Sequence, residues 1–130
     1  MSTYGEIFSA ESANQNFGPV QNSIQLPVSI IKPLLSITGT SIMFKIINNQ
    51  VVILDSHRNV IYPQAHTINP DEVFTLYTTS VLKDLLDQGS ESNIEIQERT
   101  SVLSVGYSDR VLESGTNCPP NCSSNNNSTE

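Results

Sequence analysis

Basic residues are scarce in this sequence. It has six Lys and Arg against thirteen Asp and Glu, which gives a formal net charge of −7 and a pI near 4.6. Proteins that bind nucleic acids or anionic membranes need a basic surface, and six scattered cations do not supply one. We therefore expect neither nucleic acid nor a membrane as a partner. An acidic surface suits a basic protein or a cation.

Long apolar runs are also missing. No stretch approaches the roughly 20 residues that a membrane-spanning helix needs. Residues 1–8 lack the basic start and apolar segment of a secretory signal. We therefore expect the protein in the cytoplasm, or released with an assembly.

Apolar residues are unevenly distributed and indicate three regions. Ile, Val and Leu concentrate in the middle of the chain, whereas Ser and Asn concentrate at both ends. We predict a flexible N-terminal arm over residues 1–22, a small folded domain over residues 23–112, and a disordered tail rich in Cys, Asn and Ser over residues 113–130. No internal repeat is found at the spacing of solenoid proteins.

The folded region begins with a clear alternation of apolar and polar residues. Ile24, Leu26, Val28 and Ile30 alternate with polar positions and Pro27 from residue 23 onward, which predicts a half-buried strand. Pro27 lies on the polar phase and removes one hydrogen-bond donor. This strand should therefore lie at the edge of a sheet.

The next region predicts a three-stranded antiparallel meander. Apolar runs cover residues 42–47 and 51–54, and Asn48 and Asn49 separate them. Asparagine tolerates the positive φ that tight hairpin turns require. A second turn over residues 55–59 leads to a third strand over residues 60–62, which Pro63 ends.

One helix is predicted after this meander. Asn69 is a suitable N-cap, Pro70 suits the first helical position, and Glu72 has the spacing of a capping box. A helical stripe follows and Gly89 suits the end of the helix. The stripe comprises Phe74, Tyr77, Val81, Leu82 and Leu85.

Two further strands alternate on opposite phases, over residues 93–97 and 103–107, so a bulge or turn is expected near residues 99–101. These elements predict an α+β fold, with a mainly antiparallel sheet of about five strands, one helix packed on one face, and flexible tails. A mostly β sandwich with a short helix is the alternative.

Catalytic constellations are not recognisable. His57 and His66 lie in predicted loops, and solvated loop histidines explain them best. Glycine-rich phosphate-binding loops are missing, and Glu95 should face solvent because it alternates with apolar neighbours. We expect no enzyme activity and no cofactor. An unrecognised small enzyme that uses His57 or His66 with an acid is a third hypothesis.

The cysteines are confined to the tail, at Cys118 and Cys122. One C-x₃-C pair is insufficient for a structural zinc site, so a disulfide, a shared ion or a modification stays open. The Cys, Ser and Thr content of residues 116–129 resembles the core segment of lanthipeptide-type precursors. That resemblance implies a tail that enzymes modify.

Two main functional hypotheses follow. The first is a non-enzymatic protein-interaction or assembly module, such as a structural subunit, an adaptor or a small acidic inhibitor. It would bind a protein partner or a second copy through its edge strand and its arms. The candidate contact residues are Ile7, Phe8 and Phe17 in the arm and Pro27 in the strand. The alternative is a precursor or substrate protein whose tail is modified.

Overall fold

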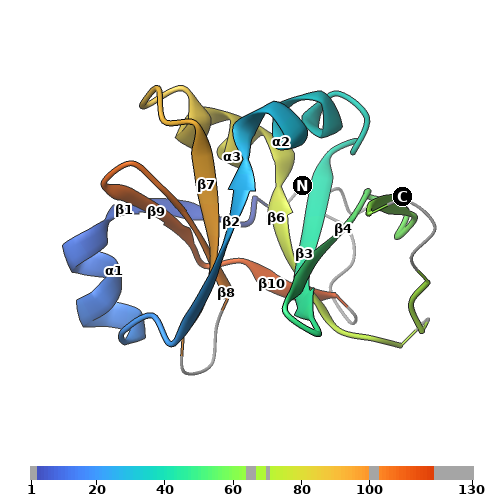
Figure 1. The fold of residues 1–130 in the computed structure, drawn as a ribbon, viewed down its shortest axis with the longest axis horizontal. Coiled ribbons are helices and arrows are strands. Elements are labelled where there is room, and N and C mark those ends of the chain that lie inside the picture. The colour runs from blue at the N-terminus through green and yellow to red at the C-terminus, as the bar shows by residue number, and fades with distance from the viewer. Residues whose placement is uncertain (1–2, 64–66, 70, 100–102, 119–130) are drawn as a thin grey trace.

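The computed structural model describes residues 3–63, 67–69, 71–99 and 103–118. Within them the chain forms ten strands and three helices (Figure 1). The helices are α1 (Ala10–Phe17), α2 (Val28–Leu35) and α3 (Thr79–Leu86). The strands are β1 (Glu6–Ser9), β2 (Asn22–Pro27), β3 (Ser41–Ile47), β4 (Gln50–Leu54), β5 (Val60–Tyr62), β6 (Phe74–Thr78), β7 (Asn93–Glu98), β8 (Leu103–Tyr107), β9 (Arg110–Glu113) and β10 (Thr116–Cys118).

The strands form two antiparallel five-stranded sheets. Sheet A has the order β1-β9-β8-β7-β2, and sheet B has the order β10-β6-β3-β4-β5. One apolar core contains side chains from both sheets together with the buried faces of α2 and α3, which lie along the top of Figure 1. The α+β class is confirmed, but the single sheet with one helix is wrong. The described residues form two sheets and three helices, which also differs from the alternative of a mostly β sandwich with one short helix.

The two sheets are built from two similar units. In each unit a strand runs directly into an eight-residue helix, and three antiparallel strands follow; the units are β2-α2-β3-β4-β5 and β6-α3-β7-β8-β9. The helices share a sequence pattern, Ser29-Ile-Ile-Lys-Pro-Leu-Leu35 and Ser80-Val-Leu-Lys-Asp-Leu-Leu86, with four of seven positions identical. The chain therefore contains an internal repeat, too long and too diverged to resemble a solenoid.

The two units exchange their first strands. β2 pairs with β7 of the second unit, and β6 pairs with β3 of the first. In this arrangement β2 corresponds to β6, and β9 corresponds to β5. β1 and β10 lie outside the two units, and they are added at edges that do not correspond to each other. β1 is added beside β9, and β10 is added beside β6. Among the described residues, no strand is added at the corresponding edges beside β5 and β2.

The predicted meander is confirmed. β3, β4 and β5 pair consecutively, and Asn48 and Asn49 form the first turn with φ values of 52° and 63°. β7 and β8 pair antiparallel; of the bulge or turn expected near residues 99–101, residues 100 and 101 lie outside the described residues.

The predicted helix is wrong in its first half. Residues 74–78 form β6, and the helix begins only at Thr79. Phe74 and Leu76 face one side of sheet B, while Tyr77 enters the main core. The first apolar residues of the predicted helical stripe therefore belong to a strand, and the later ones belong to a helix. β-branched and aromatic residues favour the strand. Asn69 and Glu72 form a single turn, in which each backbone N–H finds a partner on the other residue.

Sequence reasoning also missed α2. The alternation that begins β2 ends at Pro27, and Val28 starts a helix although Pro33 lies inside it. Ile31 and Leu35 are four positions apart and both buried, which is helical spacing. Burial of this face offsets the backbone hydrogen bond that Pro33 cannot donate.

Both terminal regions contribute to the fold in the part that the structure describes. Residues 6–17, expected as a flexible arm, form β1 and α1, and the Ser9 hydroxyl accepts from Ser12 N at the start of α1. Residues 116–118, expected as disordered tail, form β10. The arm has too few apolar residues for a core of its own, but sheet A supplies an edge and an apolar surface for it.

A second, smaller core covers the other face of sheet B. Its buried members are Met43, Val52, Leu54, Phe74, Leu76 and Cys118. Arg58 closes one end of it by donating to Cys118 O at 2.9 Å and to Glu72 O at 2.7 Å, with its guanidinium 5.6 Å from the Phe74 ring centre. The start of the tail is therefore part of the domain.

Candidate functional site

The candidate site begins at the edge of β2, beside which the described residues place no further strand. Val28 N donates to Ser92 O at 2.9 Å at the end of the β2–β7 pairing. Because backbone groups alternate between the two sides of an antiparallel strand, Ser23, Gln25 and Pro27 direct theirs away from β7. Pro27 therefore lies at a sheet edge with its missing donor on the open side, and the predicted edge position is confirmed.

Side chains of β2 also separate by face. Leu26 is buried in the main core, Ile24 is partly buried against it, and Ser23 and Gln25 are exposed on the outer face of sheet A. A strand placed beside β2 would meet one apolar side chain and two polar ones in alternation. The edge thus has a defined chemical pattern as well as free backbone groups.

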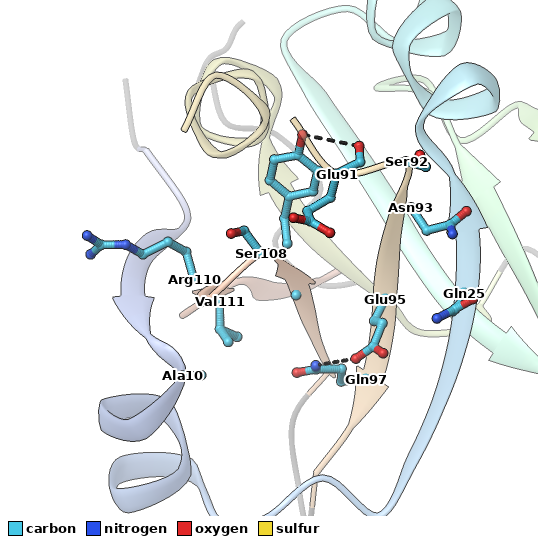
Figure 2. Close-up of a pocket in the computed structure, with 12 residues that line it drawn as sticks. Ala10, Gln25, Glu91, Ser92, Asn93, Glu95, Gln97, Ser108, Arg110 and Val111 are labelled. Atoms are coloured by element: carbon cyan, nitrogen blue, oxygen red, sulfur yellow. Dashed lines mark hydrogen bonds between the residues drawn. The ribbon is translucent and has the colours of Figure 1, made fainter. Parts of the chain in front are cut away.

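A groove of about 330 Å³ crosses the outer face of sheet A from this edge. Gln25 lies at its β2 end, Glu95 and Gln97 of β7 project into it, and Ala10 and Arg110 lie at its far end (Figure 2). It is also lined by Glu91, Ser92, Asn93, Gly106, Tyr107, Ser108 and Val111.

A glycine makes room for the Gln97 side chain in this groove. Gln25 is opposite Glu95, and Glu95 is opposite Gly106, so the three residues form one row across the sheet. A Cβ at Gly106 would lie 2.6 Å from Gln97 Nε2, which is closer than atoms can approach without movement. Gln97 Nε2 in turn donates to Glu95 Oε1 at 3.0 Å and fixes that carboxylate beside the groove floor.

Charge in the groove is mainly negative near β2. Glu91 and Glu95 belong to no ion pair among the described residues. Arg110, the basic lining residue, lies at the opposite end with its Nε 3.7 Å from Asp109 Oδ1. The groove therefore has two carboxylates without a cationic partner among the described residues, and Glu95 lies on the strand next to β2.

A buried ion pair fixes α1 beside the groove. Arg99 Nε lies 2.9 Å from Glu113 Oε2, and the two side chains are 1% and 0% exposed. Arg99 also donates to Asn14 Oδ1 at 2.7 Å and to Gly18 O, at the end of α1. Burial raises the pKa of Glu113, whereas the Ser104 hydroxyl and the Arg99 guanidinium lower it. This pair connects α1 to the outer face of sheet A.

The apolar residues expected to contact a partner pack within the chain. Ile7 lies against the main core, and the rings of Phe8 and Phe17 meet edge to face with centres 5.5 Å apart. Of the four candidate contact residues, Pro27 lies beside the open edge of β2. The structure does not bring the other three to that edge.

The structure does not bring the histidine and cysteine candidates together in one site among the described residues. His57 is exposed in the turn after β4, where its backbone N–H donates to Asp55 Oδ1 at 2.9 Å. Cys118 is buried and disulfide-bonded. His66 and Cys122 lie outside the described residues.

No group of three or more His, Cys, Asp or Glu residues is placed to hold a metal ion in the described part of the chain. In the same part, no helix has the length and apolar character needed to cross a membrane. Comparison with family models, curated proteins and solved structures found no match for this chain.

Sequence reasoning missed the groove. Alternation correctly placed Glu95 on the solvent side of its strand, which left it as one of many surface carboxylates. The cross-strand row of Gln25, Glu95 and Gly106 depends on which strands pair, and a single sequence does not contain that information.

Proposed function

We propose that this chain is a non-enzymatic protein-interaction module that binds an extended segment of a partner protein as an additional strand beside β2. The observation that carries the proposal is the open edge of β2. Ser23 and Gln25 direct N–H and C=O groups toward solvent there, and an unpaired edge is a template for another strand.

The chain's own ends support this mode of binding. β1 is a terminal segment added antiparallel to β9, and β10 is one added to β6. The edge of β2 corresponds to the edge of β6 in the internal repeat, so β10 occupies on sheet B the place that is open on sheet A. The same backbone geometry thus accepts a strand once within the chain.

Pro27 limits the length of the added strand. It provides no N–H, and it precedes α2 as the N-cap residue, whose C=O group accepts the first hydrogen bond of the helix. A partner therefore pairs mainly with Ser23 and Gln25. Such a short pairing favours reversible binding, which suits an adaptor or inhibitor.

The alternative of a modified tail receives no support from Cys118, since its sulfur is buried and already in a disulfide. Binding by strand addition is the function that the described residues favour.

Random ten-residue peptides displayed on phage, selected on the full chain, test this proposal. Gln25→Pro removes one outward N–H without touching the pairing with β7, and Gln25→Ala is the matched control that keeps this N–H. We expect selected peptides to bind wild type and Gln25→Ala alike. They should bind Gln25→Pro at least about fivefold more weakly, because one hydrogen bond is lost and the proline ring occupies the place of the N–H. Fluorescence anisotropy measures the affinities.

Ser23→Pro, on the same phase of β2, repeats the test independently, and circular dichroism verifies that each variant is folded. Equal affinity for Gln25→Pro and Gln25→Ala, or the absence of any enriched peptide, would refute strand addition at β2.

A further inference from the structure

We infer that the segment added at β2 alternates basic and apolar residues, and that its basic side chains enter the groove toward Glu95. This inference rests on the proposed function and specifies its partner. The register of sheet A, the charge of the groove and the exposure of Ile24 carry it.

The register fixes which partner side chain faces the groove. In an antiparallel pair, opposite residues project on the same face of the sheet. A partner residue opposite Gln25 therefore projects on the outer face, in line with Gln25, Glu95 and Gly106. The residue opposite Ser23 projects on the same face, and the one between them projects inward beside Ile24.

Distance then selects a long side chain. Neighbouring strands lie about 4.8 Å apart, so the partner strand lies about 10 Å from β7. A Lys or Arg side chain above Gln25 covers much of that distance and the Glu95 side chain covers the rest, whereas a short polar side chain ends over β2. Figure 2 shows Gln25 and Glu95 on adjacent strands at this end of the groove.

The charge of the groove determines the charge of the partner side chain that enters it. Glu91 and Glu95 line the groove and belong to no ion pair in the described part of the chain, and Glu95 is opposite Gln25 of β2. The net charge of −7 adds a general attraction for a cationic segment. A second copy of this acidic chain fits the site poorly, because β2 itself offers no basic residue to its partner.

The inner face selects an apolar residue. Ile24 is partly buried at the margin of the main core, so an apolar side chain beside it would cover its exposed part. The edge of sheet A thus favours the order basic, apolar, basic opposite Ser23, Ile24 and Gln25.

Three synthetic heptapeptides test this chemistry. All have Val at positions 2, 4 and 6, and positions 1, 3, 5 and 7 are Lys, Gln or Glu; their termini are acetylated and amidated. Fluorescence anisotropy at low salt measures their binding to the full chain. We expect the Lys peptide to bind best and the Glu peptide worst, with the Lys preference decreasing as salt is added.

Glu95→Gln tests the site of the preference. It keeps the acceptor for Gln97 Nε2, and we expect it to weaken the Lys peptide about threefold while leaving the Gln peptide unchanged. Glu11→Gln, an exposed carboxylate of α1 outside the groove, is the matched control and should change neither.

The outcomes separate this inference from the proposed function. If Gln25→Pro weakens every peptide but Glu95→Gln weakens none, strand addition stands and the basic preference at Glu95 is wrong. If Glu95→Gln and Glu11→Gln act equally, the attraction is general and the inference also fails. If Lys-peptide binding is unaffected by Gln25→Pro, the proposed function fails. Dimerisation that Gln25→Pro abolishes, seen by sedimentation, would make a second copy the occupant and overturn the inference.

Discussion

The buried pair of Arg99 and Glu113 is predicted to act as one energetic unit. Arg99→Met removes the guanidinium, leaves a carboxylate without its cation, and breaks the bonds to Asn14 and Gly18 that hold α1. Removing one member of a buried ion pair costs about 3–5 kcal/mol. That is a large part of the roughly 5–15 kcal/mol by which a typical domain is stable.

Urea unfolding followed by circular dichroism measures these free energies. With a slope of about 2 kcal/mol per molar urea, a loss of about 4 kcal/mol lowers the midpoint by about 2 M. Glu113→Gln should cost less, because its side-chain carbonyl still accepts from Arg99. The double variant should be more stable than the two single losses predict, by about 1–3 kcal/mol.

The pH dependence provides a second readout of this pair. Burial raises the pKa of Glu113 in the folded state, so the folded chain holds that proton more tightly than the unfolded chain. This contribution to stability is complete below the unfolded pKa and is lost as pH rises through the folded pKa. This loss of stability with rising pH should be larger in Arg99→Met and missing in Glu113→Gln.

The refuting result concerns the urea experiment. If the losses of unfolding free energy in the two single variants simply add in the double variant, with a coupling below about 0.5 kcal/mol, the reasoning is refuted.

Two further variants test the core and a turn. Tyr77 is buried, and its hydroxyl donates to Leu103 O at 2.6 Å with Leu112 O as a second, longer contact at 3.3 Å, so Tyr77→Phe should cost about 1–3 kcal/mol in urea unfolding. Burial raises the pKa of the Tyr77 phenol, so wild type should lose stability as pH rises above 10, and Tyr77→Phe should lose less; equal losses would contradict this. Gly39 has φ of 87° and its Cβ would lie 2.4 Å from Ser56 Oγ, so Gly39→Ala should lower the thermal midpoint clearly more than Gly89→Ala, where the backbone is not left-handed. Equal midpoints would show that the turn tolerates a side chain.

Local patterns predicted the local elements that depend only on neighbours in sequence. The Asn48-Asn49 hairpin and the edge position of Pro27 follow from backbone chemistry at single residues, and both are confirmed. The predicted helix after Asn69 was wrong in its first half because Phe74 and Tyr77 suit a strand as well as a helix. Only pairing with β3, which is distant in sequence, selects the strand there.

The site depends on such distant pairings even more strongly. Sequence reasoning found the edge strand through Pro27 and placed Glu95 facing solvent. It could not place Gln25, Glu95 and Gly106 in one row, since the pairings of β2 with β7 and of β7 with β8 define that row. The packing of the apolar arm residues depends on distant pairing as well, because Ile7 is paired with Leu112 of β9.

The exchange of first strands also makes the two halves of the chain inseparable. β2 completes the sheet of the second unit and β6 completes the sheet of the first, so a cut between β5 and β6 would separate β1 and β2 from the rest of sheet A and β6 and β10 from the rest of sheet B. The earliest strands cannot pair until β7 to β9 have been synthesised, and such non-local pairings slow folding. On the ribosome β1 and β2 therefore wait for β7 to β9 to emerge, whereas β3, β4 and β5 can pair with one another as soon as they are synthesised.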